Sequence, residues 1–599
     1  MNTTDRTDLL VRHMSQFLRQ IATQISPAMD SVVERLLRRT AEGHIALDLR
    51  RQESGADQAG APLAELRESV LISGLAGAPG EYKPLILDAH DRLYLYRYWD
   101  YENRVADALR RRAQWVEENP DTAAIARLIG DLFEGPHVTG QKTAAAIAAL
   151  RRLTVVSGGP GTGKTTAVVR ILSLLLELNP KLNVALAAPT GKAAARAGDA
   201  VRRAEIPVQM STKTRERIPR EAYTLHRLLG LRPGYSRYHA DNPLPYDVVV
   251  VDEASMVGVS LMARLLDALA DDCRLILLGD KDQLSSVEPG SVLGDICSFE
   301  ADYSPKFVAG VENLNAETNT APMTHALQDC VARLTHSFRF GADSGIGTLA
   351  GAIRCGDADA ALDILRDPKL PDVTLHEAAT IAELYEQLSQ QLLAGLRKYL
   401  TSIRDGADPA TVLSGFESFR LLCAFRHGQT GVAGLNKLTE QLLFDNGLID
   451  IRENWYSGRP VMVTSNDYML QLFNGDIGVT IRDEDDDAPR VVFETQGGIR
   501  SLHTPRLPGH VTVFAMTVHK SQGSEFDDVA LVLPEKTSDL LGRELIYTAV
   551  TRARHRVAIY GGAEQLKEAI NRVQRRGSGL ADKLRVAGSP GVPEQGSLF

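Results

Sequence analysis

The stretch Ser157-Gly158-Gly159-Pro160-Gly161-Thr162-Gly163-Lys164-Thr165-Thr166 decides the fold of this chain. It contains the pattern GxxxxGK[ST], whose glycines let backbone N–H groups surround a phosphate chain. The apolar run 153–156 precedes it and the helical pattern 167–178 follows it, so the motif has the strand–loop–helix context that it needs. We expect every residue from Gly158 to Thr166 to bind ATP, with Lys164 on the β- and γ-phosphates and Thr165 on Mg²⁺.

A second apolar strand ends in two carboxylates. Val248-Val249-Val250-Val251 is followed directly by Asp252 and Glu253. Parallel sheets bind their ligands at the carboxyl ends of the strands, so this pair is expected beside the phosphate loop. We expect Asp252 to hold Mg²⁺ through water and Glu253 to orient or deprotonate the water that attacks the γ-phosphate.

Short apolar runs alternate with helical stretches over most of the chain. The first series of runs is 153–156, 184–188, 248–251 and 275–278, and the second is 421–425, 511–516, 529–533 and 557–560. This alternation predicts βαβ units and parallel sheets with both faces covered. Two α/β domains fit the two series better than one oversized sheet does.

Composition narrows the class of protein. The chain has 599 residues, of which 44% are hydrophobic and 24% charged, as is ordinary for globular domains. Its formal net charge is 67 − 76 = −9, which excludes binding to nucleic acid by bulk positive charge and leaves local basic patches. The five cysteines are scattered without a CxxC pair, so we expect neither disulfides nor a zinc site. With no signal peptide and no long apolar run, a cytoplasmic protein without membrane contact is expected.

The sequence pattern of the N-terminal segment differs from that of the two α/β series. Residues 1–120 mix helical patterns with strand-like runs at 44–47 and 92–99, and they contain no phosphate loop. We interpret the segment as a mainly helical docking domain.

Residues 459–510 interrupt the second α/β series. They show period-two runs at 461–464, 477–481 and 490–494, with turn residues such as Asn474-Gly475, which predicts a small SH3-like β insertion. We interpret the acidic run 483–487 as a solvated hairpin tip rather than a metal site. The Gly/Pro/Ser-rich tail 588–599 is expected to be disordered.

Three further segments end strands or helices with groups that suit a γ-phosphate. Leu277-Leu278-Gly279-Asp280-Lys281-Asp282-Gln283-Leu284 places Gln283 as a phosphate sensor and Asp280 near the water shell of the metal. Leu334-Thr335-His336-Ser337-Phe338-Arg339-Phe340 carries Arg339, and Tyr547-Thr548-Ala549-Val550-Thr551-Arg552-Ala553-Arg554 carries Arg552. A guanidinium can cross a cleft and bind a phosphate through two parallel hydrogen bonds.

In their order, these segments resemble the motifs of superfamily 1 helicases. The phosphate loop, Asp252–Ser255, Gly279–Leu284 and the Arg339 segment are followed by Met516-Thr517-Val518-His519-Lys520-Ser521-Gln522-Gly523-Ser524-Glu525-Phe526 and the Arg552 segment. The resemblance implies two RecA-like domains: 121–345, and 346–458 together with 511–587. The β insertion 459–510 would lie within the second, and a small hairpin at 231–245 within the first.

Other segments are similar to the RecD family in particular. They are Ala188-Pro189-Thr190-Gly191-Lys192-Ala193-Ala194-Ala195-Arg196, Thr224-Leu225-His226-Arg227-Leu228-Leu229-Gly230 and Leu472-Phe473-Asn474-Gly475-Asp476-Ile477-Gly478. This resemblance implies an ATP-driven 5′→3′ DNA helicase that works beside RecB and RecC in exodeoxyribonuclease V, in double-strand-break repair by recombination. It also implies that Gln141 reads adenine and that the nuclease site is in another subunit.

The same resemblance suggests where a DNA strand would run. Hydroxyl, imidazole and ammonium groups suit contacts with phosphates, so both domains offer candidates. In the first domain they are Pro189, Thr190, Lys192, Thr224 and His226, and in the second Thr517, His519 and Lys520. The rings of Tyr235, Tyr238 and Phe473 suit either base stacking or packing.

Other functions fit the sequence less well. An ATP-binding regulatory subunit without unwinding activity is the main alternative, but intact Lys164, Glu253 and Arg552 argue against a degenerate site. A small-molecule kinase or a GTPase is disfavoured by the two-domain motif set. The terminal Gln595-Gly596-Ser597-Leu598-Phe599 resembles a peptide that docks on the bacterial sliding clamp, although chance is the more common origin of so short a match.

Overall fold

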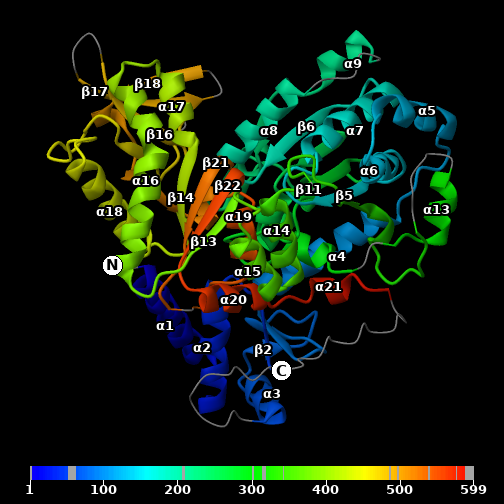
Figure 1. Cartoon of the computed structure of the whole chain (residues 1–599). Helices are drawn as coiled ribbons and strands as arrows, with labels where there is room; N and C mark the ends of the chain where they lie inside the picture. Colours follow the sequence, from blue (N-terminus) through cyan, green and yellow to red (C-terminus); the bar gives the residue numbers. More distant parts are fainter. Residues whose placement is uncertain are drawn as a thin grey trace.

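The computed structural model describes residues 3–50, 62–204, 210–299, 302–312, 319–341, 343–467, 469–483, 488–495, 498–536, 538, 540–574 and 576–586. Two parallel sheets stand side by side with helices around them, and the N-terminal helices pack below both (Figure 1). No helix among the described residues is long and apolar enough to cross a membrane. Residues 484–487 of the acidic run and the tail 588–599 lie outside the described residues.

The first sheet contains the phosphate loop. It has six parallel strands in the order β12-β5-β11-β10-β6-β7. Their bounds are β5 Leu153–Gly158, β6 Val184–Ala188, β7 Ala222–Thr224, β10 Val248–Val251, β11 Arg274–Gly279 and β12 Val331–Leu334. Every residue of β5 and β10 is buried, because helices cover both faces of the sheet. We call this sheet and its helices the first lobe.

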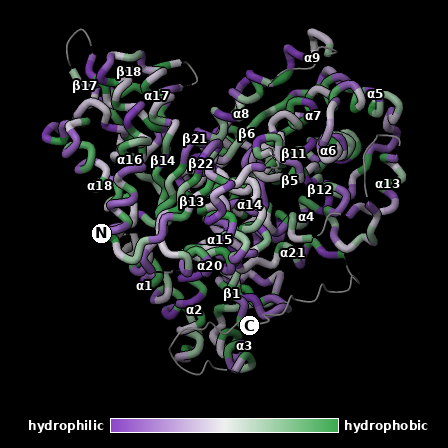
Figure 2. Tube along the Cα trace, viewed as in Figure 1, coloured by the Kyte–Doolittle hydropathy of each residue, from purple (hydrophilic) through white to green (hydrophobic). Residues whose placement is uncertain are grey.

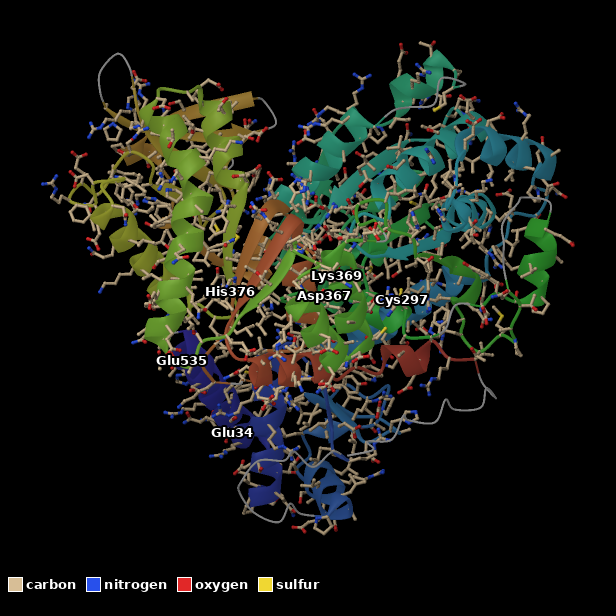
Figure 3. All side chains as sticks on the ribbon, in the orientation of Figure 1. Glu34, Cys297, Asp367, Lys369, His376 and Glu535 are labelled. Carbon is tan, nitrogen blue, oxygen red and sulfur yellow. The ribbon has the colours of Figure 1, made fainter. Side chains whose placement is uncertain are left out.

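The second sheet is also parallel, with five strands in the order β13-β22-β21-β14-β20. The bounds are β13 Val373–His376, β14 Phe419–Cys423, β20 Ala515–Thr517, β21 Phe526–Val532 and β22 Ala553–Tyr560. At its edge His376 of β13 stacks on Tyr560 of β22 with ring centroids 4.6 Å apart, and Figure 3 labels His376 there. This sheet and its helices are the second lobe, and the expected pair of α/β units is confirmed.

The helices follow from their apolar periodicity. Those of the first lobe are α5 Thr122–Leu132, α6 Thr139–Leu150, α7 Lys164–Leu178, α8 Gly191–Arg203, α9 Thr212–Arg217, α10 Leu225–Leu228, α11 Val259–Ala268, α12 Val292–Ile296 and α13 Pro305–Val311. Those of the second are α14 Gly345–Cys355, α15 Ala358–Arg366, α16 Ile381–Arg404, α17 Pro409–Glu417, α18 Val432–Asp445, α19 Arg543–Val550 and α20 Ala563–Asn571. In α16 buried leucines recur every four residues, and hydrophobic and hydrophilic stretches alternate along its trace (Figure 2).

One predicted strand of the second series, at residues 511–516, is wrong. The run 511–516 is two strands in different sheets: β19 His510–Thr512 pairs with β15 of the insertion, and β20 pairs with β14. The chain passes from one sheet to the other at Val513 and Phe514, which are both buried. A continuous apolar run therefore hid a change of sheet.

The β insertion is a five-stranded antiparallel sheet in the order β18-β17-β16-β15-β19. Its further strands are β15 Pro460–Val463, β16 Ile477–Arg482, β17 Pro489–Thr495 and β18 Gly498–His503. Seven buried hydrophobic residues form a core of its own. The short hairpin expected in the first lobe is also present, as β8 Leu231–Arg232 paired with β9 Tyr235–Ser236.

The N-terminal region combines helices with a small sheet. Its helices are α1 Thr3–Ile21, α2 Pro27–Ala41, α3 Leu63–Ile72 and α4 Tyr96–Gln114, and its strands are β1 Ala46–Asp48, β2 Ala76–Gly77, β3 Leu85–Leu87 and β4 Arg92–Leu95. The predicted strand 92–99 is therefore wrong after Leu95. Buried Tyr98, Glu102, Val105 and Leu109 recur at helical spacing, and this pattern outweighs the tyrosine alternation at its start.

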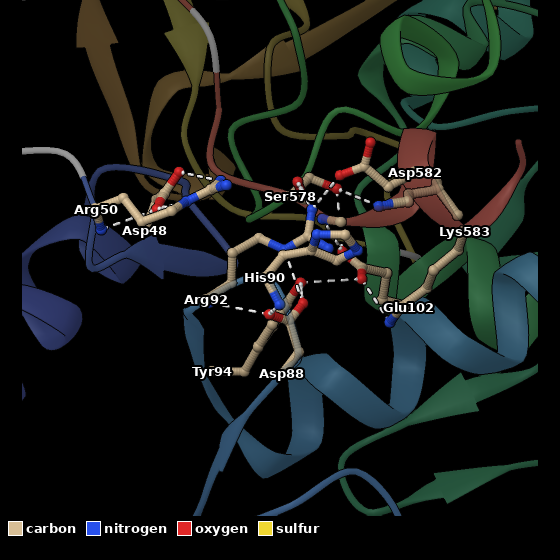
Figure 4. A network of polar contacts seen from close by, with 12 residues as sticks. Asp48, Arg50, Asp88, His90, Arg92, Tyr94, Glu102, Ser578, Asp582 and Lys583 are labelled. Carbon is tan, nitrogen blue, oxygen red and sulfur yellow. Dashed lines mark hydrogen bonds and ion pairs between the residues drawn. The ribbon is translucent and has the colours of Figure 1, made fainter. Parts of the chain in front are cut away.

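A C-terminal segment packs against this region through a network of polar contacts. Glu102 of α4, whose side chain is fully buried, accepts hydrogen bonds from Ser578 and from the backbone N–H of Gly579 at 2.8 Å, and it pairs with Lys583 of α21 Leu580–Lys583 (Figure 4). Arg92 bridges Asp88 and Asp582 in the same network. We call residues 576–586 the C-terminal strap.

Candidate functional site

The phosphate loop joins β5 to α7 as the sequence predicts. Gly161 and Gly163 have φ of 74° and 77°, a left-handed conformation that glycine adopts without strain. A Cβ atom at Gly158 would lie 2.6 Å from Thr162 Oγ1, so the loop is too tightly wound for a side chain there. The ε-ammonium of Lys164 donates to the carbonyls of Gly158 at 2.6 Å and Gly159 at 2.9 Å. The loop thus holds its lysine folded over the hollow in which phosphates would lie.

The expected metal ligands meet beside this loop. Thr165 and Asp252 line one small cavity at the start of α7. Burial, and then the charge of Glu253, raise the pKa of Asp252 to about 6, while the ammonium of Lys164 acts in the opposite sense. A carboxylate whose charge is held away from water gains most from a cation, so the donor set of one hydroxyl and one carboxylate fits Mg²⁺ bound together with phosphates. No group of three His, Cys, Asp or Glu side chains that could hold a metal occurs among the described residues.

Asp280 and Gln283 lie at the junction of the two lobes. Asp280 is 2% exposed, and its Oδ2 accepts hydrogen bonds from Gln283 at 3.1 Å and from the hydroxyl of Tyr547 at 3.1 Å. Tyr547 belongs to α19 of the second lobe, and its hydroxyl also lies against Gly159 of the phosphate loop. The proposed phosphate sensor Gln283 is therefore hydrogen-bonded to Asp280, which in turn accepts a hydrogen bond from the second lobe.

Arg339 lies directly over the phosphate loop. Its Cβ would collide with a side chain at Gly161, and the N–H of Phe338 donates to the Gly161 carbonyl at 2.8 Å. The residue is in the connector between β12 and α14, rather than in the second sheet itself. Its Nη2 donates to Glu525 Oε1 at 2.6 Å, whereas its buried Nη1 has no hydrogen-bond partner among the described residues.

Glu525 gathers arginines from both lobes. Arg196 of α8 pairs with it at 3.0 Å and donates to the Gly523 carbonyl at 2.8 Å, and Arg554 approaches it at 3.5 Å. Burial alone would raise the pKa of Glu525, but the charges of Arg196 and Arg339 lower it to about 2. We call the contacts of Arg196 with Glu525 and Gly523 the interlobe latch.

Arg552 is also at this junction. It is 3% exposed, and its guanidinium donates to the carbonyls of Ser524 at 3.0 Å and Thr548 at 3.3 Å. Burial lowers its pKa, and the nearby carboxylates of Glu253 and Glu525 act in the opposite sense. Arg339 thus covers the phosphate loop, and the guanidinium of Arg552 is close enough to Glu253 to feel its charge.

Gln141 is buried on the far flank of the phosphate loop. It is 3% exposed and contacts the Thr162 carbonyl through its amide nitrogen, at 3.5 Å. It forms part of a cavity of about 170 Å³ whose other lining residues are His137, Thr139, Gly140, Thr162, Leu334, Thr335 and His336.

The candidate DNA contacts lie near the carboxyl ends of three strands. Thr190 is the second residue after β6, whereas Thr224 and Thr517 end β7 and β20. Each hydroxyl caps the helix that comes next, with distances of 3.2, 3.2 and 3.3 Å to the capped N–H. Capping is a structural task that leaves a hydroxyl able to meet a phosphate as well.

The remaining candidates vary in exposure. His226 is exposed, and Pro189 and His519 are partly exposed. Lys520 donates to Asn474 of the insertion at 2.9 Å, and burial lowers the pKa of Lys192.

The aromatic candidates divide in the same way. Phe473 of the insertion packs on the first lobe, because a Cβ atom at Gly191 would lie 3.0 Å from its own Cβ. Tyr235 at the tip of the small hairpin is 58% exposed, and Tyr238 is half-buried.

Several residues of the site were not predicted from the sequence to belong to it. Arg196 and Glu525 stand inside quoted motifs, yet only their pairing in space marks them. Tyr547, His137 and His336 were likewise read as part of motifs or passed over. They share no local signal: Arg196 and Tyr547 lie inside helices, and His137 lies in the loop between α5 and α6.

Two family models match the chain. Residues 141–289 match an AAA domain, and residues 512–560 match a UvrD-like helicase C-terminal domain. Among curated proteins, the RecBCD enzyme subunit RecD of Mycolicibacterium smegmatis is 39% identical over 590 residues, which cover 96% of this chain and 97% of that protein.

The chain belongs to the RecD family. The RecBCD enzyme subunit RecD of Haemophilus influenzae is 35% identical, with 82% of this chain and 80% of that protein covered. A solved structure of Bacteroides Pif1 bound to ssDNA is 19% identical and covers 68% of this chain and 88% of that one, with a TM-score of 0.36. Membership of the RecD family confirms the resemblance drawn from the motifs and, with it, an ATP-dependent DNA helicase.

Proposed function

We propose that this chain is the 5′→3′ motor of a RecBCD-type complex: it hydrolyses ATP with Mg²⁺ between its two lobes and so moves along single-stranded DNA. RecB and RecC are the proposed partners, since the curated relatives are named as subunits of the RecBCD enzyme. In such a complex the strand breakage would belong to another subunit.

The observation that carries the proposal is the meeting of both lobes at the phosphate loop. Lys164 comes from the first lobe and the hydroxyl of Tyr547 from the second, and both lie against Gly159. Arg339 covers Gly161 from the connector that links the lobes. A phosphate chain in this loop would therefore be bound by groups that move with different lobes.

Each polar group then has a definable task. Lys164 and the loop N–H groups bind the phosphates, and Asp252 with Thr165 holds the magnesium ion, which when bound neutralises charge that develops on the phosphates. Glu253 orients the attacking water. Arg339 and Arg552 contribute positive charge toward the γ-phosphate, and Gln283 reports its presence to Asp280 and Tyr547.

The binding energy of these phosphate contacts is large enough to switch the lobes between an open and a closed arrangement. Moving a two-state equilibrium almost completely takes about 5.5 kcal/mol of differential binding. A hydrogen bond to a charged group contributes roughly 1.5–3 kcal/mol, so Arg339, Arg552 and Gln283 together reach this range. One base-pair step costs about 1.4 kcal/mol to open, which is well below the bias available per ATP.

The DNA strand would cross the carboxyl ends of both sheets. Thr190, Thr224 and His226 lie at that edge of the first lobe, and Thr517 with Lys520 lies at that edge of the second. Closing and opening the cleft changes the distance between these two groups of phosphate contacts. None of them reads base edges, so weak sequence preference is expected.

ATP hydrolysis by purified full-length variants tests the proposal. Lys164→Gln should abolish ATP hydrolysis stimulated by single-stranded DNA, while the exposed Lys181→Gln just beyond α7 should leave it unchanged. Hydrolysis at the normal rate in Lys164→Gln would refute the site. Unwinding of a substrate with a 3′ tail, but not of one with a 5′ tail, would refute the polarity.

A contact with the sliding clamp remains a separate proposal. The peptide Gln595-Gly596-Ser597-Leu598-Phe599 lies outside the described residues, and its sequence alone supports the idea. Equal clamp binding by the full chain and by a version ending at Glu594 would dispose of it.

A further inference from the structure

Two histidines stack on each other at the edge of the cavity that contains Gln141. His137 lies between α5 and α6, and His336 lies in the segment after β12. Their ring centroids are 4.0 Å apart and their planes differ by 14°. Both residues are exposed and both line the cavity, so the stack forms a wall of the cavity that solvent or a ligand can reach.

The position of this wall is fixed relative to the phosphate loop. Thr162 of the loop lines the same cavity. The segment of His336 is bound to the loop through the Phe338 N–H, which donates to the Gly161 carbonyl, and through Ser337 Oγ, which donates to the Pro160 carbonyl at 3.3 Å. The cavity therefore adjoins the loop that would hold the phosphates of a nucleotide.

The local backbone holds the rings in place at a cost. His137 has φ of 63°, in the left-handed region that residues with a side chain seldom adopt. Gly140 leaves no room for a side chain, because a Cβ atom there would lie 2.7 Å from the Arg333 carbonyl. Strain of this kind clusters at ligand sites, where the surrounding structure maintains it for a purpose.

A third ring extends the aromatic surface. Phe338 meets His336 edge to face, with centroids 4.9 Å apart and planes at 81°, and it is 52% exposed. The residues that line the cavity include amide and hydroxyl groups but no carboxylate, so the wall offers stacking and hydrogen bonds without repelling a phosphate ester.

We propose that His137 and His336 form a stacking platform for the base of the bound nucleotide and give the site a preference for purines. This inference rests on the proposed ATP site and extends it to two residues. The base would stack on the imidazole pair while the Gln141 amide meets its edge. A purine covers more of a stacked pair than a pyrimidine does, so ATP and GTP should bind more tightly than CTP and UTP.

Binding by the full-length protein separates the base from the phosphates. His336→Ala and His137→Ala should each weaken binding of a non-hydrolysable ATP analogue by about ten-fold, the scale of one lost stack of a base on an aromatic ring. Binding of tripolyphosphate, which has no base, should stay unchanged, and His336→Phe should restore most of the affinity for the ATP analogue. His13→Ala, at an exposed position of α1, is the matched control.

The outcomes distinguish a failure of the stacking platform from a failure of the proposed ATP site. Unchanged affinity for the ATP analogue in both alanine variants, or equal loss for the analogue and for tripolyphosphate, would overturn the platform while the phosphate site stands. Binding of both ligands by Lys164→Gln at the normal affinity would instead overturn the proposed ATP site. A purine preference that persists in the double variant His137→Ala/His336→Ala would assign the preference to other residues.

Discussion

The interlobe latch supports a quantitative prediction about the cleft. Arg196→Gln removes the ion pair with Glu525 at 3.0 Å and the hydrogen bond to Gly523 at 2.8 Å, both of which cross from the first lobe to the second. In the protein without nucleotide, we expect this change to shift the lobes toward an open arrangement.

The size of the shift follows from the carboxylate. The pKa of Glu525 falls from 4.5 to about 2 against the effect of burial, and each unit of pKa corresponds to about 1.4 kcal/mol. The total of roughly 3 kcal/mol is shared by Arg196 and Arg339, and the Arg196 side chain is 39% exposed, so water screens part of its share. About 1–2 kcal/mol remains for Arg196, a five- to thirty-fold change in the ratio of closed to open molecules.

Distances between two labels can measure that ratio. Of the five cysteines, all of which are among the described residues, Cys355 alone is exposed. Asp131→Cys on α5 and Glu386→Cys on α16, in a Cys355→Ser background, place one label on each lobe at exposed positions. Arg203→Gln, an exposed arginine of the same helix as Arg196, is the matched control.

The reasoning has a clear point of failure. Unaltered distance distributions in Arg196→Gln would show that the latch does not hold the lobes. An equal shift in Arg203→Gln would show that lost helix charge, rather than the interlobe contacts, is responsible.

Three further predictions concern pH and stability. Because the pKa of Glu525 is lowered, the latch is complete above about pH 4.5 and weakens only as the pH falls toward 2, so label distances should not change between pH 6 and 8. The raised pKa of Asp252 has the opposite effect, because above about pH 6 its buried ionised form lowers the free energy of unfolding. Asp252→Asn should therefore raise the free energy of unfolding at pH 8 by about 1–3 kcal/mol while abolishing ATP hydrolysis. This gain in stability should vanish near pH 4. Glu102→Ala would strand the buried Lys583 ammonium and the Gly579 N–H, so a loss of about 3–5 kcal/mol and faster proteolysis of the C-terminal strap are expected; equal proteolysis of variant and wild type would contradict the role of the network.

The sequence was sufficient where local chemistry decides structure. Four consecutive valines predict a buried strand, and they form β10 of a sheet that is covered on both faces. Glycines 161 and 163 stand where the backbone adopts the left-handed conformation. The sequence therefore predicted that the motifs after buried strands lie at the carboxyl ends of the first sheet, where Lys164, Thr165 and Asp252 are close together.

It failed where two local patterns compete. Tyr94, Tyr96 and Tyr98 alternate as a strand would, yet the helix α4 begins at Tyr96 because the residues that follow bury one helical face. Strand β18 was missed because its residues are mostly exposed and its alternation is weak.

It also could not reveal pairings between distant segments. Arg196, Glu525 and Arg339 lie on three separate stretches, and the motif that pointed to Arg339 did not indicate that Glu525 is its partner. The stacking of His137 on His336 is of the same kind, since it depends on how the loop before α6 approaches the end of β12. Such contacts are set by tertiary packing, which no local pattern records.

Directional movement on single-stranded DNA tests the central claim most directly. The full chain, alone and together with candidate RecB and RecC partners, is mixed with oligonucleotides that carry streptavidin on a biotin at either end, and release of streptavidin is followed with and without ATP. A 5′→3′ motor releases streptavidin from the 3′ end, only with ATP, and Lys164→Gln releases none. Release from the 5′ end alone, or equal release without ATP, would contradict a motor driven by closure of this cleft.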